Sequence, residues 1–343
     1  MRTIKNTLYV TEPGAYLSLD GENILVSREG KEVGRRPLHL LQGIVVFGYS
    51  GASPALMSKC ASYNIEISFL SQNGRFYGRF VGVPNGNVLL RREQYRIADD
   101  DSRSLDIAKS FITGKLFNSR WVIERVRRDN LMRVDTDRLK TASLLIYDRL
   151  KDIAHCDTPD GLRGLEGEAA SVYFGMFDEM ILQQKEDFIF TVRSRRPPLD
   201  AVNAMLSYMY TLLSHEAAWA LNAVGLDPYV GFLHRDRPGR LSLALDLMEE
   251  FRSVLADRFV LMLINKKLIK KSDFYKRENG AVMMSDDAKK LLLMQWQKRK
   301  QETITHPFTG EKMQWGMVLF VQAQLLSRYI RGDMDAYPPL LWK

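Results

Sequence analysis

The spacing of apolar residues changes once along this chain of 343 residues, and that change limits the folds open to it. From Asn6 to about Val83, runs rich in Val, Ile, Tyr and Phe alternate with polar residues and are interrupted by Gly, Asn and Pro. This period of two predicts short antiparallel strands joined by tight turns, with one short helix over 52–62. From about Leu105 the period becomes three to four, which is typical of amphipathic helices. We therefore predict an α+β protein in which a small N-terminal antiparallel β-sheet or β-sandwich domain precedes a larger all-α domain.

The length supports that division. At about 150 residues per domain, a chain of this size forms about two domains. The segment Pro84–Asp100 spans the change of period and serves as the boundary. We expect a β-rich domain over 1–90 and a helical domain over 91–343.

Capping and turn residues divide the helical part further. Asp200 is placed to cap a long helix that Gly225 ends, and a second helix is expected from about Ser242 to Lys271. Asn279-Gly280 predicts a small hairpin. The run Ser285–Asp287 predicts the start of a helix that ends near Lys300.

Composition excludes several classes of protein. With 45% apolar and 26% charged residues, the chain can bury a core and is unlike a disordered or collagen-like sequence. Cys60 and Cys156 are too few for a disulfide framework and lack CxxC spacing, so a reducing cytosol is expected. No signal peptide and no apolar run of about 20 residues is present, which predicts a cytoplasmic protein with no membrane span. The net charge of +8 favours a polyanionic partner such as nucleic acid or an anionic membrane surface.

Glu166 is the first candidate for chemistry. Helical spacing places it in one stripe with Ala170, Tyr173 and Phe177, so a carboxylate projects from a face of small and apolar residues. A carboxylate on such a face is costly unless it meets a cation. The alternative is that Glu166 merely favours the dipole near a helix start.

A second group lies in the segment 231–250, GFLHRDRPGRLSLALDLMEE. His234 follows an apolar run and begins a loop, while Asp246 and Glu249 are three apart on one helical face, with Glu250 beside them. The alternatives are a satisfied loop or core histidine, and a solvated acidic edge that pairs with Arg252 or Arg240. Taken with Glu166, however, one imidazole and two or three carboxylates form a mixed N,O donor set that suits Mg²⁺ or Mn²⁺.

Basic residues surround these acids in the sequence. Seven basic and two acidic residues lie between Lys109 and Arg133, net +5, and eleven basic and four acidic residues lie between Lys266 and Lys300, net +7. Such stretches either form solvated helix faces or hold the DNA backbone. The residues expected to contact nucleic acid are Arg235, Arg237, Arg240, Lys266 and Lys267.

Three motifs, in this order and separation, resemble one known family. LRGLEGEAASVYF, PPLDAVNAMLSYMYTLLSHE and GFLHRDRPGRLSLALDLMEEFR are similar to motifs of the CRISPR-associated integrase/endonuclease, the larger nuclease of spacer acquisition. The resemblance covers essentially the whole chain. It implies that Glu166, His234 and Glu249 are ligands of Mg²⁺ or Mn²⁺ and that Asp246 is a helper or alternative ligand. Some family members carry Asp at the position of Glu249 and many carry Pro at that of Glu250, so Glu250 is a rival carboxylate.

The resemblance also implies partners and a reaction. It implies a homodimer that forms largely through the β-rich domain over 1–90. Two such dimers would clamp a small ferredoxin-like CRISPR adaptation protein. The substrate would be double-stranded DNA, namely a prespacer and the CRISPR repeat. The 3′-OH ends of the prespacer would attack phosphodiesters of the repeat. Two alternatives are a non-catalytic nucleic-acid-binding scaffold that uses the basic helices, and a metal-dependent phosphohydrolase of small phosphoesters.

Overall fold

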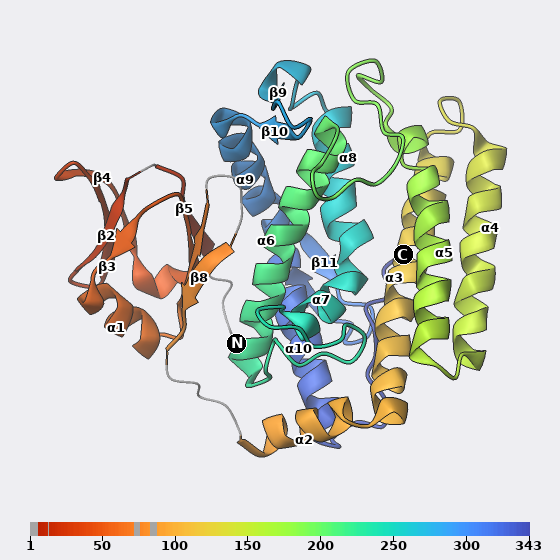
Figure 1. Cartoon of the computed structure of the whole chain (residues 1–343), viewed down its shortest axis with the longest axis horizontal. Coiled ribbons are helices and arrows are strands. Elements are labelled where there is room, and N and C mark those ends of the chain that lie inside the picture. Colours follow the sequence, from red (N-terminus) through yellow and green to blue (C-terminus); the bar gives the residue numbers. More distant parts are fainter. Residues whose placement is uncertain (1–5, 13, 72–75, 83–87) are drawn as a thin grey trace. The chain divides into compact units, whose positions relative to one another are not determined.

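The computed structural model describes residues 6–12, 14–71, 76–82 and 88–343 (Figure 1). The chain divides into two compact units, one of Met1–Asn85 with Lys290–Glu302 and Gln314–Met317, and one of Gly86–Lys289 with Thr303–Met313 and Val318–Lys343. The sequence boundary near residue 90 stays a prediction. Its segment 84–87, together with the turn expected over 72–74, lies outside the described residues.

Strands dominate the first unit, as the period of two predicted. They form two four-stranded sheets with the orders β1-β5-β7-β8 and β4-β3-β2-β6. The short helix expected over 52–62 is also present as α1, and the side chain of Ser53 caps its start by accepting from the N–H of Leu56. The bounds are β1 Asn6–Val10, β2 Tyr16–Asp20, β3 Asn23–Arg28, β4 Lys31–Pro37, η1 Leu38–Leu40, β5 Leu41–Phe47, β6 Gly51–Ala52, α1 Pro54–Ser62, β7 Glu66–Leu70 and β8 Phe76–Phe80.

The expectation of purely antiparallel strands was wrong. Antiparallel pairing holds for β2 with β3, β3 with β4 and β7 with β8, but β1–β5, β5–β7 and β2–β6 are parallel. Parallel neighbours need a crossover connection, which α1 provides between β5 and β7. Alternation of side chains along a strand is the same in both directions, so the sequence period does not reveal the direction.

One apolar core serves both sheets. It combines Leu17 and Ile24 of one sheet with Ile44 and Ile67 of the other, and Leu56 of α1 is fully buried among them. Shared burial of this kind is what holds two small sheets together as a sandwich.

The remainder of the chain is mainly helical, but the expectation of an all-α domain needs correction. Two small two-stranded sheets, β9 with β10 and β11 with β12, lie among the helices. Each is a local hairpin of three-residue strands, too short to produce a clear period of two. The bounds are α2 Val88–Ala98, α3 Asp101–Asp129, α4 Thr136–Asp152, η2 Ile153–His155, α5 Pro159–Gly175, η3 Asp178–Met180, α6 Ala201–Val224, α7 Ser242–Met248, η4 Glu249–Phe251, η5 Arg252–Asp257, α8 Arg258–Asn265, η6 Lys271–Asp273, β9 Phe274–Lys276, β10 Val282–Met284, α9 Asp286–Gln301, β11 Thr303–Thr305, β12 Lys312–Gln314 and α10 Trp315–Ile330.

The predicted capping residues lie where the sequence placed them. Asp200 accepts a hydrogen bond from the N–H of Asn203 at the start of α6, and Gly225 ends that helix with φ of 88°. The Asn279-Gly280 turn joins β9 to β10. Ser285 accepts from the N–H of Ala288 at the start of α9.

The helix expected from Ser242 to Lys271 is instead a succession of four segments. It begins as α7, tightens into the 3₁₀ turn η4, widens into the π-helix η5 and ends as α8 at Asn265. Irregular segments of this kind frequently accompany functional sites, and they redirect side chains relative to a regular helix. Glu249 and Glu250 both lie in the 3₁₀ turn.

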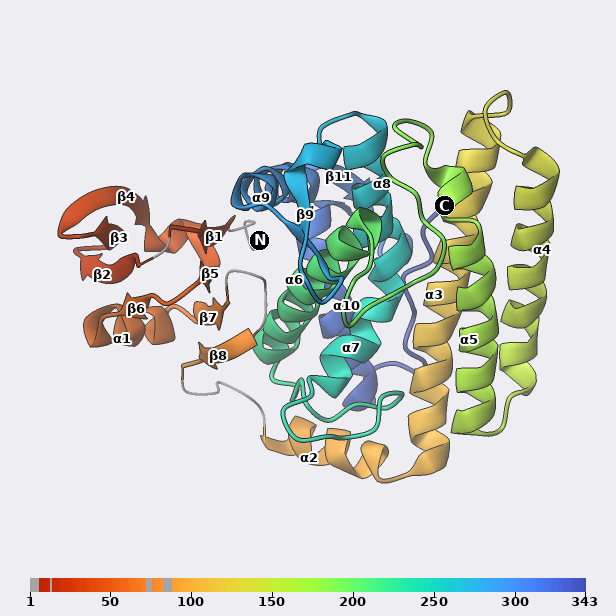
Figure 2. The same ribbon diagram turned by 45° about the horizontal axis from the view of Figure 1, so that its top comes forward.

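Helix α3 is the element on which the site is built. Figures 1 and 2 show α3, α4 and α5 side by side, and α3 also contacts η4 and η5. Side chains from α3, α5 and η4 therefore meet in one place. None of the described helices is long and apolar enough to cross a membrane.

Candidate active site

Two glutamates from different helices converge on one lysine of α3. The ammonium nitrogen of Lys115 forms ion pairs with Glu166 Oε1 of α5 and, at 2.8 Å, with Glu249 Oε2 of η4. Glu249 is almost wholly buried, whereas the side chain of Glu166 is 28% exposed. The Glu166 carboxylate, which the sequence placed on an apolar helix face, is therefore paired with a cation, the Lys115 ammonium. The Glu249 carboxylate is paired with the same ammonium.

Arg252 completes what we call the ion cluster: Lys115, Glu166, Glu249 and Arg252. Its guanidinium lies 3.0 Å from Glu249 Oε1, and it also lies over the ring of Tyr210, 4.9 Å from the ring centroid. The alternative in which Glu249 pairs with Arg252 therefore holds, but as a buried pair and not as a solvated edge. Burial alone would lower the pKa of Arg252, but the acidic groups around Arg252, above all Glu249, outweigh burial and raise that pKa.

These cations keep Glu249 ionised. Burial alone would raise the pKa of Glu249, but Arg252 and Lys115 outweigh burial and lower that pKa to about 2. A buried carboxylate that is ionised at neutral pH is available as a ligand or a charge partner.

Asp246 orients His234. Asp246 Oδ1 lies 2.6 Å from His234 Nδ1, and the carboxylate accepts three backbone N–H groups, from Phe232, Leu233 and His234 itself. Because the Asp246 carboxylate is an acceptor, the simplest arrangement puts a proton on Nδ1 of His234, and Nε2 is the ring nitrogen that Asp246 does not engage. A Cβ on Gly231 would lie 2.8 Å from Asp246 Oδ2, so only glycine lets the loop approach this closely.

Glu250 is occupied elsewhere. Its carboxylate accepts from the hydroxyl of Tyr337 at 2.6 Å, from Gln322 Nε2 at 2.8 Å and from the N–H of Leu340 at 2.6 Å. Burial raises the pKa of Glu250 to about 7, against the lowering effect of these donors. A Cβ on Gly114 of α3 would lie 2.9 Å from Glu250 Cγ, so the side chain is closely packed as well. The Glu250 carboxylate, the alternative metal ligand from the sequence, is thus held by residues of the segment 322–340.

The donor set fits a divalent cation of the Mg²⁺ or Mn²⁺ class. Among the residues that the structure describes, no three His, Cys, Asp or Glu side chains already gather around one point as metal ligands do. Two carboxylates nevertheless contact a single cation, the Lys115 ammonium, which marks a place where positive charge is stabilised. His234 is held by Asp246, three positions before Glu249 in the chain. Oxygen-rich sets with one imidazole suit these hard cations.

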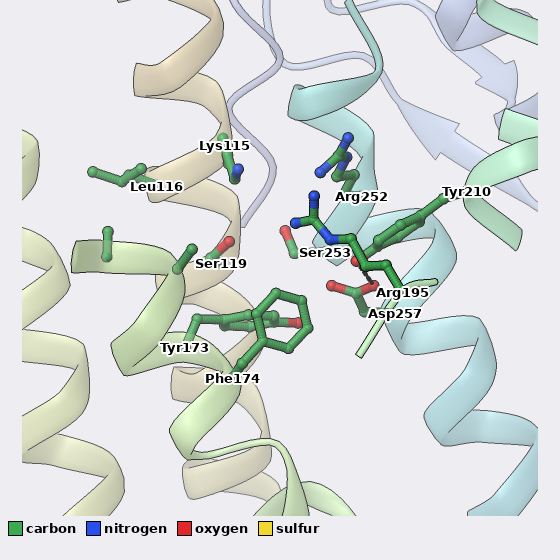
Figure 3. A pocket seen from close by; sticks show the side chains of 12 residues that line it. Lys115, Leu116, Ser119, Tyr173, Phe174, Arg195, Tyr210, Arg252, Ser253 and Asp257 are labelled. Atoms are coloured by element: carbon green, nitrogen blue, oxygen red, sulfur yellow. Dashed lines mark hydrogen bonds between the residues drawn. The ribbon is translucent and has the colours of Figure 1, made fainter. Parts of the chain in front are cut away.

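A small pocket adjoins the ion cluster. It has a volume of about 30 Å³ and is bordered by Lys115 and Ser119 of α3, Tyr173 of α5, and Ser253 and Asp257 of η5. Figure 3 shows Lys115 and Arg252 projecting from opposite walls and the hydrogen bond from the Tyr210 hydroxyl to Asp257, 2.6 Å long. Burial raises the pKa of Asp257 to about 6, although the hydroxyls of Tyr210 and Tyr173 lower it. Charged and polar groups thus line the pocket next to the paired acids.

The basic residues expected to contact DNA fall into two locations. Arg235 and Arg237 are exposed, and Arg240 is half-buried, in the loop that follows His234. Lys266 and Lys267 are also exposed but follow α8, 17 and 18 residues after Glu249 in the chain. Only the loop arginines lie next to the candidate ligands in the chain.

Much of the basic stretch Lys109–Arg133 serves the fold. Arg125 lies over the ring of Trp342, 4.0 Å from its centroid, while Arg127 pairs with Glu124 and Arg133 donates to the carbonyl of Leu182. The solvated or structural interpretation is therefore favoured for this part of α3. Lys115 is the member of the stretch that reaches the acids.

Sequence reasoning did not anticipate the roles of Lys115, Tyr210 and Asp257. Lys115 is one of the seven basic residues of the stretch 109–133, which the sequence leaves open between a solvated helix face and a DNA contact, and Tyr210 lies in the second family motif with no role assigned. The signal that could have identified Lys115 is its place in α3 directly after Gly114, where two helices approach closely. Its partners are 51 and 134 positions away, and helical spacing carries no information at that range.

Comparison with known proteins decides the family. Residues 8–298 match the family described as CRISPR associated protein Cas1. The chain belongs to the Cas1 family. A curated relative, "CRISPR-associated endonuclease Cas1 1" of Chlorobaculum tepidum, is 48% identical over 343 residues, all of both chains. The predicted resemblance to the larger CRISPR adaptation nuclease is confirmed, and with it the function of a Cas1 endonuclease and integrase of spacer acquisition.

Solved structures support the Cas1 assignment. A structure described as "Casposase bound to integration product" matches with a TM-score of 0.84 and 25% identity, over 99% of this chain and 95% of that chain. A "Cas6-RT-Cas1--Cas2 complex" matches with a TM-score of 0.82 and 21% identity, over 100% of this chain and 36% of that chain, and shows a shared fold. The prediction of a strand-rich N-terminal region followed by a largely helical C-terminal region is confirmed.

Proposed function

We propose that this Cas1 family member inserts short foreign DNA fragments into a CRISPR array by a Mg²⁺- or Mn²⁺-dependent reaction at Glu166, His234 and Glu249. In this reaction the 3′-OH ends of a prespacer duplex attack phosphodiesters of the repeat. The observation that carries the proposal is the convergence of Glu166 and Glu249 on one cation, with His234 held by Asp246 of the adjoining helix α7.

The chain's own residues divide the work. Glu166 and Glu249 hold the metal ion through carboxylate oxygens, and His234 offers Nε2. Asp246 is a positioning residue, because its carboxylate fixes the ring of His234 and the backbone of the loop through four contacts. When bound, the metal ion polarises a phosphoryl oxygen and stabilises the leaving oxygen.

The basic loop supports DNA binding at this place. Arg235, Arg237 and Arg240 follow His234 directly and bring three positive charges to the edge of the candidate site. Burial and the charge of Arg237 lower the pKa of Arg240, so the two guanidiniums are close enough to repel each other. A phosphate backbone would relieve that repulsion. We assign Lys266 and Lys267 to a more distant part of the same duplex.

The partners follow from the family. We propose a homodimer formed through the strand-rich unit, two of which clamp a small ferredoxin-like CRISPR adaptation protein. A structural neighbour described as a Cas1–Cas2 complex supports a protein partner of this kind. The free and buried thiols Cys60 and Cys156 suit a reducing cytoplasm, where we place the protein.

The test is an integration assay with a 3′-OH duplex and a supercoiled plasmid that carries the repeat, in Mg²⁺, Mn²⁺ or EDTA. We expect strand transfer only with metal, and a loss of about a hundredfold or more in Glu166→Gln, His234→Ala and Glu249→Gln. Glu168→Gln is the matched control, because Glu168 lies on the same helix but is exposed and pairs with Arg149. DNA binding indifferent to Mn²⁺, with no phosphodiester products, would instead identify a scaffold. Cleavage of simple nucleotide esters without duplex DNA would identify a phosphohydrolase.

A further inference from the structure

The charges of the ion cluster are already balanced. Glu166 and Glu249 carry two negative charges, and Lys115 and Arg252 carry two positive charges within ion-pair distance. A divalent ion that joined this cluster without any rearrangement would leave it with two surplus positive charges in a largely buried place. Like charges at such short range repel by several kcal/mol even at an effective dielectric constant of about 20. One of the two cations therefore has to leave when the metal ion binds.

Arg252 is poorly placed to leave. Its guanidinium is held between Glu249 Oε1, at 3.0 Å, and the face of the Tyr210 ring. Its position in the π-helix η5 also ties it to backbone that packs against α3. A planar guanidinium fixed by an ion pair and a ring has little freedom.

Lys115 has both the freedom and the space. Its ammonium is a compact charge on four flexible methylenes. It borders the pocket of about 30 Å³ shown in Figure 3, whose wall includes Ser119, Ser253 and the acid Asp257 as well as the guanidiniums of Arg195 and Arg252. The hydroxyl of Ser253 is buried and has no hydrogen-bond partner among the described residues, so the pocket wall holds an unused polar group. A turn of the lysine stem toward the pocket takes the ammonium away from both carboxylates.

We propose that Lys115 is a resident counter-cation, which holds Glu166 and Glu249 together in the metal-free protein and is displaced by the divalent metal ion. The inference rests on the proposed function, because it assumes that these two glutamates are metal ligands. Lys115 is thus a positioning residue that competes with the metal ion. The competition makes the protein bind metal more weakly than its ligands alone would allow, and keeps two buried carboxylates from repelling each other when metal is absent.

The first test is Mn²⁺ affinity, measured on the full chain by the electron paramagnetic resonance signal of free Mn²⁺. We expect Lys115→Met, which removes the charge but keeps the length, to bind Mn²⁺ about tenfold more tightly or better. Lys115→Arg, which keeps the charge, should bind no more tightly than the wild type. Lys109→Met is the control, because it removes a half-buried positive charge from the same helix away from the ion cluster. Equal or weaker Mn²⁺ binding by Lys115→Met would overturn the proposal.

The second test uses the wild-type protein, so it does not depend on whether a variant folds. The protein is acetylated briefly with an N-hydroxysuccinimide ester, with and without Mn²⁺, and the modification of each lysine is measured by mass spectrometry. We expect the labelling of Lys115 to rise severalfold with Mn²⁺, because its ammonium leaves two ion pairs, while the labelling of Lys109 stays constant. Unchanged labelling of Lys115 would contradict displacement.

The two proposals can fail separately. If Glu166→Gln and Glu249→Gln bind Mn²⁺ as the wild type does, the proposed metal site itself is wrong. If both variants lose Mn²⁺ binding but Lys115→Met gains none, the metal site stands and only the displacement of Lys115 is wrong.

Discussion

Glu249 and Glu250 are neighbours in the chain and both are buried, yet they lie in opposite environments. Glu249 faces Lys115 and Arg252, and its pKa is lowered to about 2 against the effect of burial. Glu250 faces the neutral donors of Tyr337, Gln322 and Leu340, and burial raises its pKa to about 7. Burial is common to both, so what separates them is whether the partners are cations or neutral dipoles. The cations beside Glu249 keep its carboxylate ionised and able to bind a ligand. The neutral donors beside Glu250 hold its carboxylate in hydrogen bonds that stabilise the fold.

The largest expected effect tests that division through activity. Glu249→Gln should reduce strand transfer by about a hundredfold or more, because it removes an anionic ligand. Glu250→Gln should stay within about threefold of the wild type at a temperature where both are folded, since no part of its carboxylate faces the ion cluster. Integration rates at saturating Mn²⁺ measure both. Equal losses in the two variants would show that the carboxylates act as one unit and would break the comparison.

The second-largest expected effect is a loss of folding stability when Glu250 is removed. Glu250→Ala leaves the buried hydroxyl of Tyr337 and the N–H of Leu340 without their acceptor and removes one of the acceptors of Gln322, which should lower the free energy of unfolding by about 3 kcal/mol. Urea denaturation in EDTA measures it, with Glu168→Ala as a control for loss of an exposed glutamate. A loss below about 1 kcal/mol would mean that water or a shifted side chain satisfies the donors.

Asp257 extends the comparison to a third acid of the same helical run. Burial raises its pKa from 3.8 to about 6, and Tyr210 is its hydrogen-bond donor. Because the folded protein holds the proton more tightly than the unfolded chain, the stabilising contribution is full below pH 3.8 and is lost as the pH rises through about 6. The difference in unfolding free energy between wild type and Asp257→Asn should therefore change by ~1–3 kcal/mol across this window. A difference that does not vary with pH would show that Asp257 is ionised throughout, as Glu249 is.

Local patterns explain what the sequence could predict. The change of period revealed the strand-rich start and the helical remainder, and Asp200 and Gly225 marked the ends of α6 because caps act within four residues. The motifs also singled out Glu166, His234 and Glu249, of which the structure brings Glu166 and Glu249 together at Lys115. Strand direction was beyond reach, since alternation is the same for parallel and antiparallel neighbours.

Long-range partners explain the rest. The sequence left Glu250 as a rival of Glu249, and what distinguishes them lies 72 to 90 positions further along the chain, in Gln322, Tyr337 and Leu340. The π-helix that follows them has the apolar spacing of an ordinary helix, so its widening cannot be read from the pattern. Pairing across the fold, and not local propensity, decides which of two adjacent acids is free for chemistry.

The smallest expected effect isolates a single neutral donor. Tyr337→Phe removes the hydroxyl that donates to Glu250 Oε1 while the ring keeps its packing against Phe111, whose centroid lies 5.3 Å away. The carboxylate keeps two donors, so the free energy of unfolding should fall by only about 1 kcal/mol, with integration unchanged. Tyr329→Phe is the matched control, because its hydroxyl makes no hydrogen bond to the described residues and its loss should leave stability within about 0.5 kcal/mol of the wild type. If Tyr337→Phe slows integration while the unfolding free energy stays constant, the C-terminal segment positions Glu249 through Glu250, and the two environments are coupled despite their different chemistry.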